Sequence, residues 1–102
     1  MNKKDSSLRF IDVDWIHDFE EEPIRLVSEI DSDGYETRKL EIFREGKIGF
    51  ATSTQSSHDT DLSEKPIPSL KEINESPEFV GKEISKQTFN DLWKNFGPDS
   101  TQ

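Results

Sequence analysis

The fold of this 102-residue chain is decided by residues 24–53, IRLVSEIDSDGYETRKLEIFREGKIGFATS, where three partly apolar segments are separated by two short turns. The turn SDG ends in Gly34, and the turn REG ends in Gly46. Glycine readily adopts the left-handed backbone that a three-residue hairpin loop requires at its last position. The stretch therefore predicts an antiparallel meander of three strands.

The two loops also predict which side chains share a face of the sheet, because a shift of one residue would turn every side chain over. A loop at 32–34 aligns Asp31 with Tyr35, and a loop at 44–46 aligns the next two strands in the same way. Both alignments put apolar residues on one buried face. The expected pairs are Ile24–Ile42, Leu26–Leu40, Arg25–Glu41, Ile42–Ile48 and Leu40–Phe50. Val27 and Phe43 are expected on the outer face of the sheet, where they are exposed and available for self-association or a partner.

A fourth strand is expected in LRFIDVDWI, residues 8–16, because apolar and polar residues alternate there. Asp12 and Asp14 point to one side of this strand. The apolar residues that point to the other side are Ile11, Val13 and Trp15.

Two helices are expected in the C-terminal half. Ser69 and Glu72 have the spacing of a capping box, Ser85 is a capping residue before an apolar stripe, and Gly97 with Pro98 gives a stop signal. The stripe consists of Phe89, Leu92, Trp93 and Phe96. We therefore expect an α+β domain, with an antiparallel sheet of about four strands and the two C-terminal helices packed on one face. The last helix is expected to dock on Trp15, Leu26, Leu40 and Phe50.

The length of the chain fits one domain, which we expect at residues 8–96, between a flexible N-terminus at 1–7 and a flexible tail at 97–102. The chain has no cysteine, so disulfides and thiolate metal sites are excluded. Its N-terminal lysines are not followed by an apolar run, and no segment is long and apolar enough to cross a bilayer. A cytoplasmic location is therefore expected.

The chain carries a surplus of acidic residues, with 22 Asp and Glu against 13 Lys and Arg and a formal net charge of −9. A polyanion repels nucleic-acid phosphates, so we expect no direct nucleic-acid binding, whereas a basic protein would suit this surface. General solubility is the alternative explanation of the charge. The acids gather in WIHDFEEEP, residues 15–23, and around the long polar loop near 52–61. The candidate partner-binding residues are Asp12, Asp14, Asp18, Glu20, Glu21, Glu22, Asp59, Asp61 and Glu64.

Histidine and the acids also raise an enzymatic alternative. His17 with Asp14 or Asp18 could serve a small hydrolase or a metal-dependent enzyme, because histidine titrates near neutrality and carboxylates hold hard cations. However, neither His17 nor His58 lies in a nucleophile motif, and the acid run passes from a strand into a loop rather than converging. We therefore expect no catalytic residue, no cofactor and no metal site.

Six short segments resemble a small bacterial domain family of unknown function. They are WIH (15–17), EEP (21–23), SEID (28–31), RKLEIF (38–43), LSEKPIPSLKEI (62–73) and the EIS...F...LW pattern of 83–93. The resemblance spans about residues 8–96 and implies a shared fold, with no functional residue to carry over. By its size and acidity the chain also resembles immunity proteins of bacterial toxin systems, including contact-dependent inhibition.

The resemblance to immunity proteins implies a partner, a cognate toxin domain that is commonly a cationic nuclease. The favoured hypothesis is therefore a non-enzymatic immunity protein whose carboxylates occupy the groove in which the toxin holds nucleic acid. An acidic regulatory or adaptor module is a further alternative, which differs from the first only in its partner.

Overall fold

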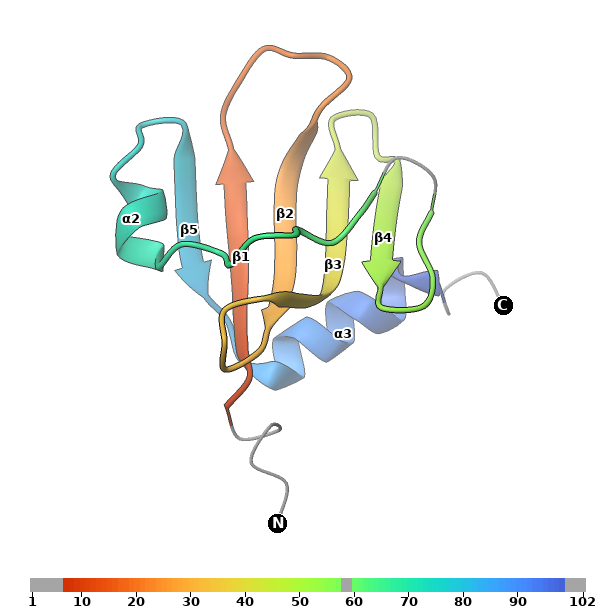
Figure 1. The fold of residues 1–102 in the computed structure, drawn as a ribbon. Coiled ribbons are helices and arrows are strands. Elements are labelled where there is room, and N and C mark those ends of the chain that lie inside the picture. The colour runs from red at the N-terminus through yellow and green to blue at the C-terminus, as the bar shows by residue number, and fades with distance from the viewer. Residues whose placement is uncertain (1–6, 58–59, 99–102) are drawn as a thin grey trace.

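The computed structural model describes residues 7–57 and 60–98, and these form a five-stranded antiparallel sheet with two helices. The α+β class is confirmed, but the sheet has five strands rather than about four. The strand order is β4–β3–β2–β1–β5, with α2 directly before β5 and α3 directly after it (Figure 1). The bounds are β1 Arg9–Trp15, β2 Pro23–Ile30, β3 Glu36–Phe43, β4 Ile48–Thr52, α2 Leu70–Asn74, β5 Phe79–Glu83 and α3 Lys86–Phe96.

Both predicted hairpin loops are confirmed. The Asp31 N–H donates to the Tyr35 carbonyl at 2.9 Å, and Gly34 closes the loop with a φ of 94°. Gly46 has a φ of 95° in the second loop. The pairs Ile42–Ile48 and Leu40–Phe50, predicted for β3 and β4, are present in the sheet.

The predicted register between β2 and β3 is wrong by one residue, and a β-bulge at Thr37 is the cause. Ile30 pairs with Glu36 but Glu29 pairs with Arg38, so Thr37 has no opposite residue. An extra residue on one strand shifts the pairs that follow by one. The structure accordingly pairs Arg25 with Ile42, Leu26 with Glu41 and Val27 with Leu40, in place of the expected Ile24–Ile42, Arg25–Glu41 and Leu26–Leu40. A second irregularity, between Arg25 and Pro23, restores the original alignment at the pair Pro23–Phe43.

The bulge changes which residues are buried. Val27 is fully buried rather than exposed, and Phe43 is only 9% exposed. Val27 now shares a face with Leu40, because residues that are paired on neighbouring strands point to the same side. Leu26 points to the opposite face, where it packs with the cluster formed by Ile11, Val13 and Ile30.

The two helices pack on opposite faces of the sheet, which corrects the expectation that both cover one face. Phe89, Leu92 and Trp93 of α3 pack with the cluster of Phe10, Val27 and Leu40. We call this side the helix face. On the other side, Leu70 and Ile73 of α2 and Ile67 pack with the cluster that contains Ile11 and Val13. Trp15 is on this second side with Ile11 and Val13, and not under α3 as expected.

The second side is crossed by the segment between β4 and α2. Figure 1 shows this segment passing in front of β3, β2 and β1, with α3 behind the sheet. We call residues 60–69 the strap and this side of the sheet the strap face. The Ile67 N–H donates to the Gly34 carbonyl at 2.7 Å, which ties the strap to the first hairpin loop.

The predicted helix termini are confirmed. Ser69 and Glu72 form a capping box at the start of α2, and the Ser85 side chain accepts a hydrogen bond from the Thr88 N–H at the start of α3. Gly97 is the C-cap of α3. Within the described part of the chain, no helix has the length and apolar character needed to cross a membrane.

Candidate functional site

The loop between β1 and β2, residues 16–22, gathers exposed acidic and apolar side chains. Ile16 is 59% exposed and Phe19 is 62% exposed, so the loop presents two large apolar side chains to solvent. The acids of this loop, Asp18, Glu20, Glu21 and Glu22, are also exposed, and their carboxylates have no hydrogen bond or ion pair among the described residues. The loop therefore offers two apolar contacts surrounded by unpaired negative charge.

His17 holds the acidic loop in one conformation. Its Nε2 donates to the Pro23 carbonyl at 2.8 Å, and its Nδ1 accepts from the Phe19 N–H at 2.9 Å, so the neutral ring carries its proton on Nε2. The ring also lies 4.3 Å from the Trp15 ring, centroid to centroid. Arg44 adds a hydrogen bond from its Nη2 to the His17 carbonyl at 2.8 Å.

This geometry favours a structural role for His17. Both ring nitrogens are bonded to the backbone of the loop, and neither is bonded to a carboxylate. Asp14, a candidate partner in the enzymatic alternative, lies on the helix face of β1 and is exposed there. Among the described residues, no group of three or more His, Cys, Asp or Glu residues is arranged to hold a metal ion. His58 lies outside the described residues.

The structure separates Asp12 from the exposed acids. Asp12 is 5% exposed, and its two carboxylate oxygens accept hydrogen bonds from Arg25 Nε at 2.9 Å and Nη2 at 2.7 Å. The hydrogen bond to Asp12 is the main cause that raises the pKa of Arg25 above its ordinary value, against the opposing effect of burial. Asp12 is therefore already paired within the sheet.

Asp14 remains part of the exposed surface. It is paired across the sheet with Val80, which is 55% exposed, and both lie on the helix face of the sheet. Ile16 is expected on the same side as Asp14, because side chains two positions apart in an extended chain point to the same side. The acidic loop thus continues into a small patch that consists of Asp14, Ile16 and Val80.

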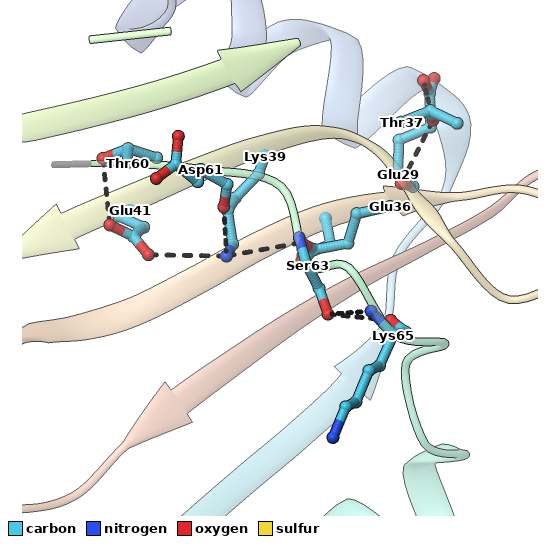
Figure 2. Close-up of polar contacts among 10 residues, drawn as sticks. Glu29, Glu36, Thr37, Lys39, Glu41, Thr60, Asp61, Ser63 and Lys65 are labelled. Carbon is cyan, nitrogen blue, oxygen red and sulfur yellow. Dashed lines mark hydrogen bonds and ion pairs between the residues drawn. The ribbon is translucent and has the colours of Figure 1, made fainter. Parts of the chain in front are cut away.

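The remaining candidates lie on the strap. Asp61 and Glu64 are exposed, and Asp59 lies outside the described residues. The strap is bound to β3 through the polar contacts that Figure 2 shows, including a hydrogen bond from Lys39 Nζ to the Asp61 carbonyl at 3.1 Å. The structure therefore brings four of the predicted acids together in the acidic loop and leaves Asp61 and Glu64 on a separate segment.

Sequence reasoning placed the acids but missed the two apolar residues beside them. Phe19 interrupts the acid run, and Ile16 directly follows the last residue of β1. The signal that could have identified both is the presence of large apolar residues within a run of charged residues. The Phe19 ring contacts Trp15 and His17 but remains mostly exposed.

Residues 9–98 match the family model described as "Domain of unknown function (DUF6881)". No curated protein and no solved structure matches the chain.

Proposed function

We propose that this chain, which belongs to the DUF6881 family of domains of unknown function, is a non-enzymatic immunity protein that binds and neutralises a cationic toxin domain. The observation that supports the proposal most directly is the acidic loop, residues 16–22. Its four acids are exposed and have no hydrogen bond or ion pair within residues 7–57 and 60–98, while His17 fixes the backbone that carries them. A fixed loop loses little conformational freedom when a partner binds, which favours affinity.

The two kinds of side chain in the loop have different roles in this proposal. The carboxylates attract a positively charged surface, which speeds association and disfavours partners of the wrong charge. Phe19 and Ile16 supply the apolar contacts, and large aromatic residues dominate the binding energy of many interfaces. A nuclease groove that holds phosphates would accept the carboxylates in their place, so the bound loop would block the substrate.

The interface test needs a candidate partner, and we expect to find one as the basic C-terminal domain of a large secreted protein encoded next to the gene for this chain. Replacing Glu20, Glu21 and Glu22 together by glutamine keeps the size of the side chains but removes three negative charges. We expect the association rate to fall about ten-fold at low salt and the difference to shrink as salt is added, because exposed charges are screened. Unchanged binding would show that the interface lies elsewhere.

A control variant separates local charge from total charge. Glu75, Glu83 and Asp91 are exposed acids outside the loop, and changing them to Gln, Gln and Asn alters the net charge by the same amount. We expect this control to bind the toxin at nearly the original rate.

A Phe19→Ala variant should instead leave the association rate unchanged and speed dissociation about ten-fold or more, which corresponds to at least 1.4 kcal/mol. Binding to a basic protein without toxic activity would favour the adaptor alternative.

A further inference from the structure

A cavity of about 430 Å³ lies on the strap face between the sheet, the strap and α2. Most of its wall is apolar, and the main apolar residues are Ile11, Val13, Leu26, Ile67, Ile73 and Phe79. A largely apolar cavity of several hundred Å³ with a few polar groups is the usual form of a site for a small molecule.

The polar part of the cavity wall is built around Glu36. The Glu36 side chain is only 4% exposed, and its carboxylate accepts hydrogen bonds from Ser28 Oγ at 2.8 Å and from the Ser63 N–H at 2.7 Å. Lys39 Nζ lies 3.4 Å from the same carboxylate. Figure 2 shows how Glu36, Lys39 and Ser63 meet where the strap crosses β3.

The charge of this wall is negative. Glu36 and Glu72 both line the cavity, and Lys39 is the cation that lines it with them. Lys39 also forms an ion pair with a second carboxylate, because its Nζ lies 3.6 Å from Glu41 on β3. Two carboxylates and one ammonium group thus line the cavity, so its wall has an excess of one negative charge, which attracts a cation and repels an anion.

The contacts of the strap keep the cavity open. Thr60 donates a hydrogen bond to Glu41 at 3.0 Å, Asp61 and Ser63 are bound to Lys39 and Glu36, and Ile67 is bound to Gly34. These bonds fix the distance of the strap from the sheet at several points along its length.

We infer that the cavity binds a small molecule with an apolar body and one ammonium group. The apolar walls would take the body out of water, which is favourable in proportion to the area buried. The ammonium group would lie near Glu36 and Glu72, because a buried cation requires an anionic partner. This site is separate from the acidic loop and does not depend on the proposed toxin.

The test compares three probes of equal chain length, octylamine, octanol and octanoate, by calorimetry on the full chain. We expect octylamine to bind saturably at one site and about ten-fold more tightly than octanoate, with octanol between them. Equal or tighter binding of octanoate would overturn the inference. It would show that the head group of the ligand binds to Lys39 rather than to the carboxylates. The absence of saturable octylamine binding would overturn it as well.

Two variants distinguish the cavity from general attraction of amines to an acidic protein. Ser76 lines the cavity, so Ser76→Phe should fill part of it and weaken octylamine binding about ten-fold, while Ser53→Phe on an exposed turn should have no effect. Glu72→Gln removes a charge but can still form the capping box with Ser69. It should reduce the preference for octylamine over octanoate several-fold without unfolding α2. Unchanged binding by both Ser76→Phe and Glu72→Gln would place the amine elsewhere and refute the inference.

Discussion

The Asn74 side-chain amide forms two hydrogen bonds with the backbone of Gly81. Its Nδ2 donates to the Gly81 carbonyl at 3.0 Å, and the Gly81 N–H donates to its Oδ1 at 2.6 Å. Gly81 is in the middle of β5, which is an edge strand of the sheet. The amide thus takes the place of a neighbouring strand at this position, which protects an edge that could otherwise pair with another chain.

Replacing Asn74 by alanine should therefore have two effects. We expect the free energy of unfolding to fall by about 1–2 kcal/mol, because two hydrogen bonds are lost at a partly exposed site. We also expect association that increases with concentration, because the Gly81 backbone becomes free to pair. Urea denaturation and sedimentation velocity measure the two effects. Asn95→Ala, at an exposed position of α3, should show neither, and a monomeric Asn74→Ala would contradict the protective role.

The ion pair of Glu29 and Arg38 predicts a pH dependence of stability. Burial by itself would raise the pKa of Glu29, but hydrogen bonds from Arg38 and Thr37 and the charge of Arg38 outweigh it, so the pKa lies below its ordinary value. Arg38 donates to Glu29 at 3.1 and 2.7 Å and lies over the Phe89 ring at 4.8 Å. The pair therefore joins the sheet to α3.

Because the pKa of Glu29 is lower in the folded state than in the unfolded state, its ionised form stabilises the fold. This stabilisation is fully present above the unfolded-state pKa, about 4.3, and is lost as the pH falls through the folded-state pKa. We expect Glu29→Gln to be less stable than the original protein by about 2 kcal/mol at pH 7, with the difference shrinking below pH 4. Denaturation in urea across this pH range measures it. A difference that stays constant with pH would show that the charge of Glu29 does not contribute.

Gly49 allows the strap to approach β4 closely. A Cβ at this position would overlap the Thr60 hydroxyl, which donates a hydrogen bond to Glu41. We expect Gly49→Ala to lower the free energy of unfolding by about 1–3 kcal/mol, because a side chain forced into a packed site causes strain. Thr60→Ala removes the hydroxyl, so the double variant should be more stable than the sum of the two single effects predicts. Additive effects would exclude this contact as the cause.

The His17 hydrogen bonds predict local protection from hydrogen exchange. The Phe19 N–H is bonded to His17 Nδ1, so His17→Ala should speed exchange of the Phe19 amide about ten-fold or more. We expect amides of the helix-face cluster, such as that of Val27, to exchange at unchanged rates. Equal exchange of the Phe19 amide in both proteins would show that His17 does not hold the loop.

Sequence patterns predicted the local features of this fold well. The hairpin loops follow from Gly34 and Gly46, and the helix starts follow from Ser69 and Ser85, because each depends on residues only a few positions apart. The acidic loop was also placed correctly between two strands. Its charge is visible in the sequence because four acids lie within five residues, Asp18 to Glu22.

The missed features depend on contacts between distant residues. The bulge at Thr37 leaves both flanking strands with ordinary strand sequences, so the turn chemistry of Gly34 could not reveal it. β5 was not expected because FVGKE is short and mostly exposed, and it becomes a strand by pairing with β1. The burial of Asp12 depends likewise on Arg25, which reaches it only after β1 and β2 have aligned.

The position of β1 inside the sheet, between β2 and the edge strand β5, has a consequence for how the domain folds during synthesis. β1 is one of the first elements made, yet it lies between β2 and β5, and β5 is completed only at Glu83. Until then one edge of β1 lacks its partner strand, β5. The helix face is covered later still, because α3 follows β5 in the chain. Contacts between such distant parts of the chain form late and slowly. We therefore expect the sheet to stay incomplete during synthesis until β5 and α3 have left the ribosome.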